Sequence, residues 1–451
     1  MKSSAPLRTL GIAVALALAG ALPVSARLTP AEIERLSKDL TPVGAERAGN
    51  ADGSIPAWTG GLTKPPAGWM PAKGYTDPFA DDKPLFTITA ENMARHQDKL
   101  SAGTQALLKK YPNFTMPVYP TRRTAAYPAR VTTQVSDQAG NVESSGVTVK
   151  NAGGSTVPFP IPKTGAQAML NHNLRYIGGG LDRSYESFAV RSNGEFGKIG
   201  FRERRIFDAN FDVSTPNLLS RFLAYYTSPA ALEGTMYLVV APVDREQEAN
   251  QSWIYNAGQR RVRRAPDLAY DAVADGTEGL ITIDQYDAFN GALDRFDWKL
   301  VGKREMYVAY NGYRIGDKKT PYKDVIQKNT VNAALMRYEL HRVWVVEATL
   351  KPGSKHMFPR RTFYLDEDSW SVLYEDAYDS RGELWRVGVH GLVQYYDALV
   401  PWYRMSVWHD LSNGAYLLGS LDNEQPGIWK FDQKGKVVDF QPDALRRAGI
   451  K

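Results

Sequence analysis

The fold of this chain is indicated most clearly by one stretch, Trp253-Ile254-Tyr255-Asn256-Ala257-Gly258-Gln259-Arg260-Arg261-Val262-Arg263-Arg264-Ala265-Pro266. Aromatic and β-branched residues come first and are typical of a strand, Gly258 supplies a turn, and a second short run rich in arginine follows. The stretch therefore predicts a β-hairpin. Its aromatic and basic side chains favour the binding of a partner over catalysis.

Similar short runs separated by turn residues surround this hairpin, and they predict an antiparallel β domain over residues 171–451. In the run Arg342–Leu350, the even positions are mainly apolar, as expected for a strand with one buried face. One helix is expected against the sheet at Pro216–Tyr226, capped by Thr215 and carrying a broad apolar stripe. The predicted strands are Met236–Ala241, Ser252–Tyr255, Arg261–Arg264, Met306–Tyr310, Arg342–Leu350, Arg361–Leu365, Trp370–Tyr374 and Leu384–Val389.

The first 26 residues predict a cleavable secretory signal peptide. Lys2 and Arg8 form a short basic region, an apolar run follows, and Val24-Ser25-Ala26 fits the small-residue cleavage rule. The apolar run is shorter than the roughly 20 residues that a membrane span needs. The chain contains no cysteine, which excludes disulfides, thiol nucleophiles and a lipoprotein's acylated cysteine. We therefore expect a soluble, non-lipidated periplasmic protein.

Residues 27–170 predict an N-terminal arm that wraps around the β domain. Thr29-Pro30-Ala31-Glu32 has the capping residues of a short helix. Prolines are dense between Pro56 and Pro162, which disfavours a regular sheet there. A second helix is expected from Thr89 to about Lys110, and the polar segment Ser136–Thr156 predicts a loop or an exposed hairpin.

The charge of the chain is mild. Its formal net charge is +6, and the basic residues are spread along the sequence. Nucleic-acid proteins usually carry denser basic stripes, so we do not expect a nucleic-acid partner.

No familiar catalytic or metal motif stands out. The six histidines lack metal-ligand spacing, and a Gly-x-Ser-x-Gly motif is absent. Asp366-Glu367-Asp368 suits a tight turn better than a calcium loop, and Gly178-Gly179-Gly180 suits a flexible turn better than a nucleotide site. We expect neither a metal nor a cofactor.

The arginine run allows two interpretations. It can protect an exposed edge strand against aggregation, or it can form an anion-binding rim beside an apolar cavity. The rim candidates are Arg260, Arg261, Arg263 and Arg264. The cavity candidates, which can equally be ordinary sheet core, are Trp253, Tyr255, Trp344, Val346 and Phe222.

Three segments resemble those of the proteobacterial family called domain of unknown function 1329, sometimes labelled outer membrane lipoprotein-sorting protein. They are Asn50–Gly61, Trp253–Pro266 and Phe363–Trp370, and the resemblance extends over most of the chain. The resemblance implies the fold of the LolA and LolB carriers, a strongly curved antiparallel sheet or half-open barrel covered by helices around an apolar cavity. It also implies partners among inner-membrane efflux-type transporters and outer-membrane proteins, and it carries no catalytic residues.

The sequence therefore favours a periplasmic protein that binds or carries a lipid, a lipoprotein or another hydrophobic molecule. Two other functions stay open. One is a periplasmic hydrolase that acts on an envelope polymer with carboxylates from the sheet. The other is a non-catalytic adaptor of a membrane export complex, docked through the proline-rich arm.

Overall fold

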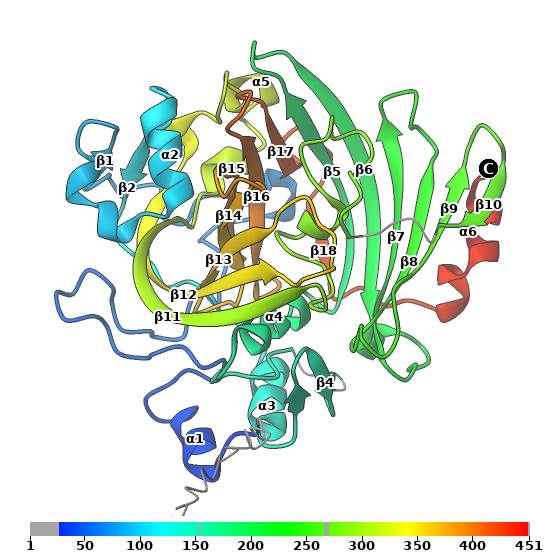
Figure 1. Ribbon diagram of the computed structural model, residues 1–451, viewed down its shortest axis with the longest axis horizontal. Helices are drawn as coiled ribbons and strands as arrows, with labels where there is room; N and C mark the ends of the chain where they lie inside the picture. The colour runs from blue at the N-terminus through cyan, green and yellow to red at the C-terminus, as the bar shows by residue number, and fades with distance from the viewer. Residues whose placement is uncertain (1–26, 153, 155, 266–269, 450–451) are drawn as a thin grey trace, which may run out of the picture.

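One large, strongly curved sheet organises the structure (Figure 1). The computed structural model describes residues 27–152, 154, 156–265 and 270–449, so the expected signal peptide lies outside the described residues. Neighbouring strands of the sheet run antiparallel in the order β11-β12-β13-β14-β15-β16-β17-β5-β6-β7-β8-β9-β10. The pairing of β17 with β5 joins the two halves of the β domain, and the sheet stays open between its edge strands β10 and β11.

The strands of this sheet range from the four residues of edge strand β10 to the 14 residues of edge strand β11. They are β5 (Gly180–Val190), β6 (Phe196–Phe207), β7 (Leu218–Ser228), β8 (Met236–Pro242), β9 (Gln251–Asn256), β10 (Arg261–Arg264), β11 (Phe296–Ala309), β12 (Tyr338–Leu350), β13 (Arg360–Asp366), β14 (Val372–Tyr378), β15 (Leu384–Tyr395), β16 (Val400–Asp410) and β17 (Tyr416–Leu421). Short strands β1 (Phe86–Ile88), β2 (Met116–Val118) and β18 (Lys430–Phe431) join them, and β2 makes the sheet mixed because it meets β12 in parallel.

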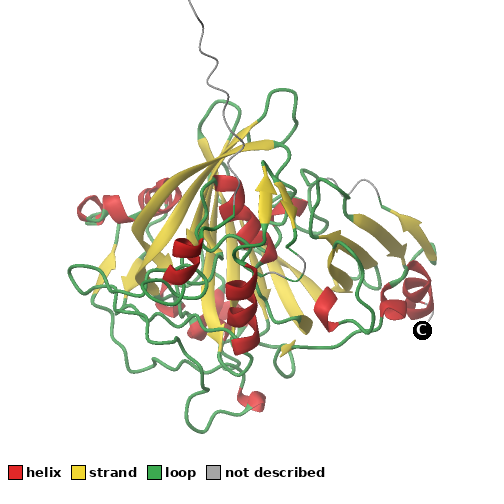
Figure 2. Cartoon of the chain, turned by 90° about the horizontal axis from the view of Figure 1, so that it is seen from below, coloured by secondary structure: helices red, strands yellow, loops and turns green. Residues whose placement is uncertain are grey.

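Helices are short (Figure 2). None of those in the described part of the chain is long and apolar enough to cross a membrane. The α-helices are α1 (Pro30–Arg35), α2 (Ala102–Lys110), α3 (Ala129–Gln138), α4 (Gly165–Leu174), α5 (Tyr322–Val325) and α6 (Pro442–Gly449). Of these, α2, α4 and α6 lie against the sheet, whereas α1 and α3 lie below it in Figure 1. Single 3₁₀ turns lie at Pro71–Lys73, Met93–Arg95, Gln97–Lys99, Asp208–Asn210, Ile283–Gln285, Tyr313–Gly316, Ala333–Leu335 and Val437–Phe440.

The predicted hairpin is confirmed. β9 and β10 pair antiparallel, with Trp253 opposite Arg264, and Arg260 closes the turn with a left-handed backbone (φ 51°). The predicted strands after residue 300 are confirmed within β11–β15, with one correction. Trp370 lies in the turn before β14 at φ 59°, so that strand begins at Val372.

The helix predicted at Pro216–Tyr226 is wrong, because Leu218–Ser228 forms strand β7. Both faces of β7 are covered: Phe222 and Tyr226 point into a cavity, while Leu223 packs with a second apolar cluster on the opposite side. A strand that is apolar on both faces has no alternation, and its sequence resembles a broad helical stripe.

The arm contains the predicted elements in part. Thr29 and Glu32 form the expected capping box at α1, and the polar segment contains the hairpin of β3 (Glu143–Ser145) and β4 (Thr148–Lys150). The helix expected over Thr89–Lys110 is an α-helix only from Ala102, because Ser101 is extended and its side chain accepts a hydrogen bond from the backbone of Thr104.

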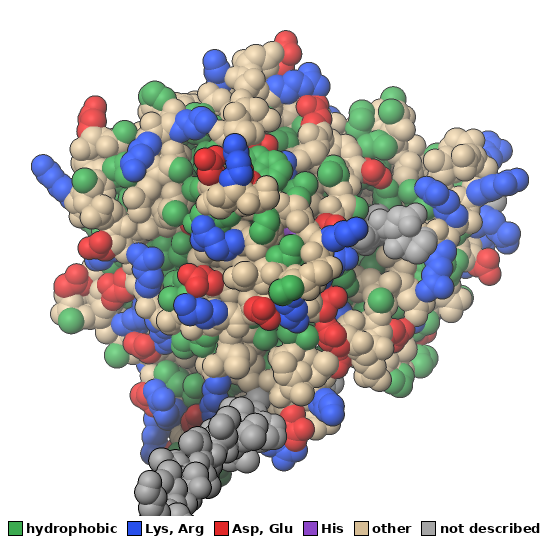
Figure 3. All heavy atoms as spheres, viewed as in Figure 1, with side chains coloured by type: hydrophobic (Ala, Val, Ile, Leu, Met, Phe, Trp, Pro, Cys, Tyr) green, Lys and Arg blue, Asp and Glu red, His purple; other side chains and the backbone are tan. Residues whose placement is uncertain are grey.

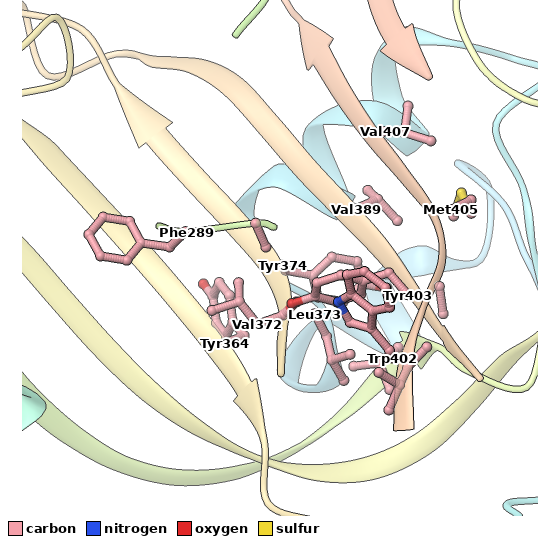
Figure 4. Packing of buried hydrophobic residues seen from close by; sticks show 14 of the residues in the cluster. Phe289, Tyr364, Val372, Leu373, Tyr374, Val389, Trp402, Tyr403, Met405 and Val407 are labelled. Carbon is pink, nitrogen blue, oxygen red and sulfur yellow. The ribbon is translucent and has the colours of Figure 1, made fainter. Parts of the chain in front are cut away.

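The main apolar core lies between the arm, α4 and strands β11–β17 (Figure 4). Tyr374, Trp402 and Tyr403 belong to it, and Phe289 joins it from the loop before β11. α4 packs on β11 and β12, and its His172 accepts at Nδ1 from the backbone N–H of Val372 at 3.2 Å and donates from Nε2 to the carbonyl of Phe289 at 3.1 Å. The core also extends onto β5–β7 through Tyr185, Phe201 and Tyr226, whose side chains border a cavity on the inner face of β5–β9.

Candidate functional site

A cavity of about 220 Å³ lies against the inner face of β5–β9. The end of α4, the loop from Tyr270 to Asn290, and strands β16 and β17 complete its wall. Cavities of roughly 150 Å³ already admit a benzene-sized molecule. The space is therefore large enough for part of an organic ligand.

Strand register arranges the cavity wall in rows, because directly paired residues project to the same face. The first row is Tyr185, Phe201 and Tyr226; the second is Arg183, Glu203, Ala224 and Tyr237; the third is Arg205, Phe222, Val239 and Ser252. The wall thus changes from aromatic to basic along the strands.

The first row and its neighbour Tyr237 form a continuous aromatic surface. The ring centroids of Tyr185 and Phe201 are 5.1 Å apart, those of Phe201 and Tyr226 4.6 Å, and those of Tyr226 and Tyr237 6.0 Å. The Tyr237 hydroxyl donates to Asp275 at 2.5 Å, and burial raises the pKa of both Tyr226 and Tyr237. These phenols stay neutral, so this end of the cavity suits an apolar group.

The second row contains a buried ion pair. Arg183 lies 2.7 Å from Glu203, and both side chains are almost completely buried. The guanidinium also lies 4.2 Å from the ring centroid of Tyr185, 4.5 Å from that of Trp402 and 4.6 Å from that of Trp429 (cation–π contacts). The guanidinium is thus held by the carboxylate of Glu203 and by three aromatic rings.

The third row begins the basic end. Arg205 lies over Phe222 at 5.1 Å and approaches the second oxygen of Glu203 at 3.1 Å. Beyond it, the half-buried Arg245 lines the cavity and donates to the carbonyl and side-chain oxygens of Asn290 at 2.6 and 3.0 Å.

A second ion pair closes the wall beside α4. Arg175 donates to Asp287 at 2.8 Å, and the indole N–H of Trp402 donates to the same carboxylate at 2.7 Å. Burial tends to raise the pKa of Asp287, but Arg175 lowers it and the net shift is downward. Burial and Arg175 lower the pKa of the adjacent His172 to about 3, so this imidazole is neutral. The carboxylates of the cavity wall are therefore bonded to cations or hydrogen-bond donors.

Of the predicted cavity residues, only Phe222 lines the cavity. Trp253 and Tyr255 project from the opposite face of β9, where they pack with Leu238 and with Leu445 of α6. Ser252, one residue away in sequence, faces the cavity instead. Side chains alternate along a strand, so a shift of one residue exchanges the two faces.

Trp344 and Val346 lie in β12, on the far half of the sheet. The Trp344 ring stacks on Trp370 with centroids 6.1 Å apart, and the Lys303 ammonium lies 4.9 Å from it. Val346 is completely buried in the main core. Neither residue lines the cavity.

The four rim candidates, Arg260, Arg261, Arg263 and Arg264, are exposed on the turn and edge strand β10. Basic side chains gather at this end of the molecule (Figure 3). None of the four lines the cavity. Their position matches that of an edge strand protected by charge.

Among the described residues, one group offers three metal-ligand atoms: His341, Asp366 and Asp368 lie with one such atom each within 4.8 Å of one another. Arg123 already donates to both oxygens of Asp368, at 2.9 and 2.6 Å, and Tyr310 donates to Asp366 at 3.2 Å. The acidic turn between β13 and β14 thereby ties the arm to the sheet, and a cation there would face a guanidinium.

The sequence analysis missed the charged residues of the cavity wall. Arg183, Glu203 and Arg205 lie within segments rich in charge, which usually indicate a solvated face. Arg245 follows β8 in a loop without any motif. Only the pairing of β5, β6 and β7, which joins residues far apart in sequence, places them together.

Comparison with solved structures gives partial similarity. A DUF1329 family protein from Desulfovibrio piger matches with 15% identity over 59% of this chain and 92% of its own, at a TM-score of 0.39. A LolA superfamily protein from Nitrosomonas europaea matches with 11% identity over 63% of this chain and all of its own, at a TM-score of 0.37.

Sequence comparison is more decisive. An uncharacterised protein of Pseudomonas aeruginosa, PA3922, is 42% identical over 436 residues, which cover 95% of each chain. The family described as protein of unknown function (DUF1329) matches residues 87–446. The chain therefore belongs to the DUF1329 family.

Proposed function

We propose that the protein binds a hydrophobic molecule in the cavity of β5–β9 and carries it through the periplasm. The observation that carries this proposal is the aromatic row of Tyr185, Phe201 and Tyr226, which borders the main core on one side and the cavity on the other. Large ring faces exposed to a cavity offer apolar area that a ligand can cover.

The energy of binding would come from the ligand's apolar surface. Each methylene group removed from water contributes about 0.8 kcal/mol. A segment of eight such groups would supply roughly 6 kcal/mol before the costs of ordering and of lost translation. Because these costs offset much of the gain, such a ligand would be released when a partner offers a competing apolar surface.

The charge arrangement favours binding over hydrolysis. A hydrolase of the carboxylate type needs one carboxylic acid and one free carboxylate near each other. In the cavity wall, Glu203 is paired with Arg183 and Asp287 with Arg175. The periplasmic location rests on the expected signal peptide, and an efflux-type transporter and an outer-membrane protein are proposed as partners.

The first test is to purify the mature protein from periplasm without detergent and to record native and denaturing mass spectra. A hydrophobic molecule recovered in near-stoichiometric amount would support the proposal. A protein that is empty and also fails to bind the fluorescent apolar probe N-phenyl-1-naphthylamine would contradict it.

A cavity-filling variant makes the test specific. Ala224 lies in the middle of the wall between Glu203 and Tyr237, so Ala224→Phe places a ring inside the cavity. We expect probe binding to weaken at least ~10-fold, the equivalent of losing about two buried methylene groups. Thr227→Phe is the matched control, because Thr227 is exposed on the same strand and does not line the cavity. Equal binding by both variants would exclude the cavity as the site.

A further inference from the structure

The cavity has more positive than negative groups at one end. Of its four arginines, Arg175 is paired with Asp287 and Arg183 with Glu203. Arg205 shares Glu203, whose other oxygen already bonds Arg183. Arg245 forms no ion pair with any described residue, and its donors reach only Asn290. The guanidinium groups of Arg205 and Arg245 therefore have between them only the one Glu203 oxygen that does not bond Arg183.

These two arginines are poorly satisfied as cations. Burial lowers the pKa of Arg245; Tyr270 opposes this shift, and the nearby charge of Arg205 adds to it, so the net shift is downward. The Nε donor of Arg205 is buried and has no hydrogen-bond partner among the described residues. Partly buried positive charges that lack a full counter-charge are costly, and an anion placed between them would offset that cost.

The basic end is separated from the aromatic end along the strands. Arg205 follows Phe201 by four residues in β6, a distance of roughly 13 Å at about 3.3 Å per residue. Between them, only the neutralised pair of Arg183 and Glu203 faces the cavity on this strand and its neighbour. The cavity is thus mainly aromatic at one end, where the Tyr237 hydroxyl bonds Asp275, and cationic at the other.

We propose that the cargo is a single-chain amphiphile with an anionic head group, bound with its head between Arg205 and Arg245 and its tail against Phe201 and Tyr226. This inference rests on the proposed function and adds the chemical class of the ligand. A guanidinium presents a planar fork of donors that matches a carboxylate or a phosphate. Cationic amphiphiles are excluded by repulsion from the same two groups.

The test compares amphiphiles of equal tail length by calorimetric titration of the delipidated protein. Decanoic acid and decyl phosphate carry anionic heads of two kinds, 1-decanol has a neutral head, and acetate has an anionic head without a tail. We expect both anionic amphiphiles to bind at least ~10-fold more tightly than 1-decanol, because charge-assisted hydrogen bonds exceed neutral ones. Acetate should not compete. The stronger of the two anionic ligands identifies the head group.

Two variants assign the effect to the cavity. Arg245→Gln should weaken decanoate binding about 10-fold and leave 1-decanol binding unchanged. Arg263→Gln is the control, since Arg263 is exposed on β10 and outside the cavity, and it should change neither. The comparison of ligands on the unmodified protein stands even where a variant folds poorly.

The outcomes separate this inference from the proposed function. Equal affinity for decanoate and 1-decanol would overturn the anionic head and leave hydrophobic binding in place. Failure of all three amphiphiles to bind would overturn both. An effect of Arg263→Gln that equals that of Arg245→Gln would place the head group at the edge strand and refute the assignment.

Discussion

The buried pair of Arg183 and Glu203 allows a quantitative prediction about the cavity. Replacing Glu203 with Met keeps its approximate volume and leaves the guanidinium without a counter-charge. For unit charges about 4 Å apart, Coulomb's law gives about 4 kcal/mol at an effective dielectric constant of about 20, and about 1 kcal/mol in water. Loss of one partner of a buried pair typically costs roughly 3–5 kcal/mol.

The surroundings of the pair refine this value. Three aromatic rings lie close to the Arg183 guanidinium and remain in Glu203→Met, so we expect a cost near the lower end, about 3 kcal/mol. Arg183→Met should cost less, because Glu203 keeps Arg205 at 3.1 Å. The double variant, with methionine at both positions, should lie within about 1 kcal/mol of the original protein.

The assay is a double-mutant cycle measured by equilibrium urea unfolding, followed by both tryptophan fluorescence and far-ultraviolet circular dichroism. The exposed cross-strand pair of Lys299 and Glu347, 3.5 Å apart, is the control and should couple by less than about 1 kcal/mol. A coupling energy for Arg183 and Glu203 no larger than that of the control would refute the reasoning, because it would mean that the cavity wall is as well solvated as the surface.

Two further predictions concern parts of the molecule outside the cavity. Leu445→Ala should destabilise the protein by about 2–4 kcal/mol in urea unfolding, because Leu445 of α6 is buried against the outer face of β8 and β9. Probe binding should stay unchanged, and a loss of binding would show that α6 supports the cavity. Burial and the neighbouring charge of Asp368 raise the pKa of Asp366 to about 7. The folded state therefore holds a proton that the unfolded state has released, and the stability contributed by this carboxyl is lost as pH rises from about 4 to about 7. Asp366→Asn should gain thermal stability relative to the original protein over this pH range, and a difference in melting temperature that does not change with pH would contradict the assignment.

The sequence predicts strands well where one face is apolar and the other polar. The hairpin around Gly258 and strand β12 follow this rule and were predicted with the correct type. β7 fails because both of its faces are covered, so its apolar residues follow no alternation. β5 and β6 were missed because charged residues such as Arg204 and Arg205 obscure the apolar positions of the same strands.

The site residues named from the sequence stay predictions, and most of them lie outside the cavity. An arginine beside an aromatic ring is found in the cavity, but the pair is Arg205 and Phe222, not Arg263 and Trp253. Local patterns identify Trp253 as apolar and part of a strand, yet they do not tell which face of the sheet meets the cavity. That depends on the long-range pairing of β5 with β17, which encloses one face and leaves the other to α6.

The open edge of the sheet affects how the cavity can respond to a guest. In a closed barrel, the number of strands and their shear fix the radius. Here β10 pairs only with β9 and β11 only with β12 among the described residues, so no ladder of hydrogen bonds sets the spacing between the two edges. A change of twist across β7–β9 can therefore alter the width of the cavity without breaking any hydrogen bond between β10 and β11. The wall can thereby adjust to ligand tails of different thickness, while Arg205 and Arg245 continue to select ligands with an anionic head group.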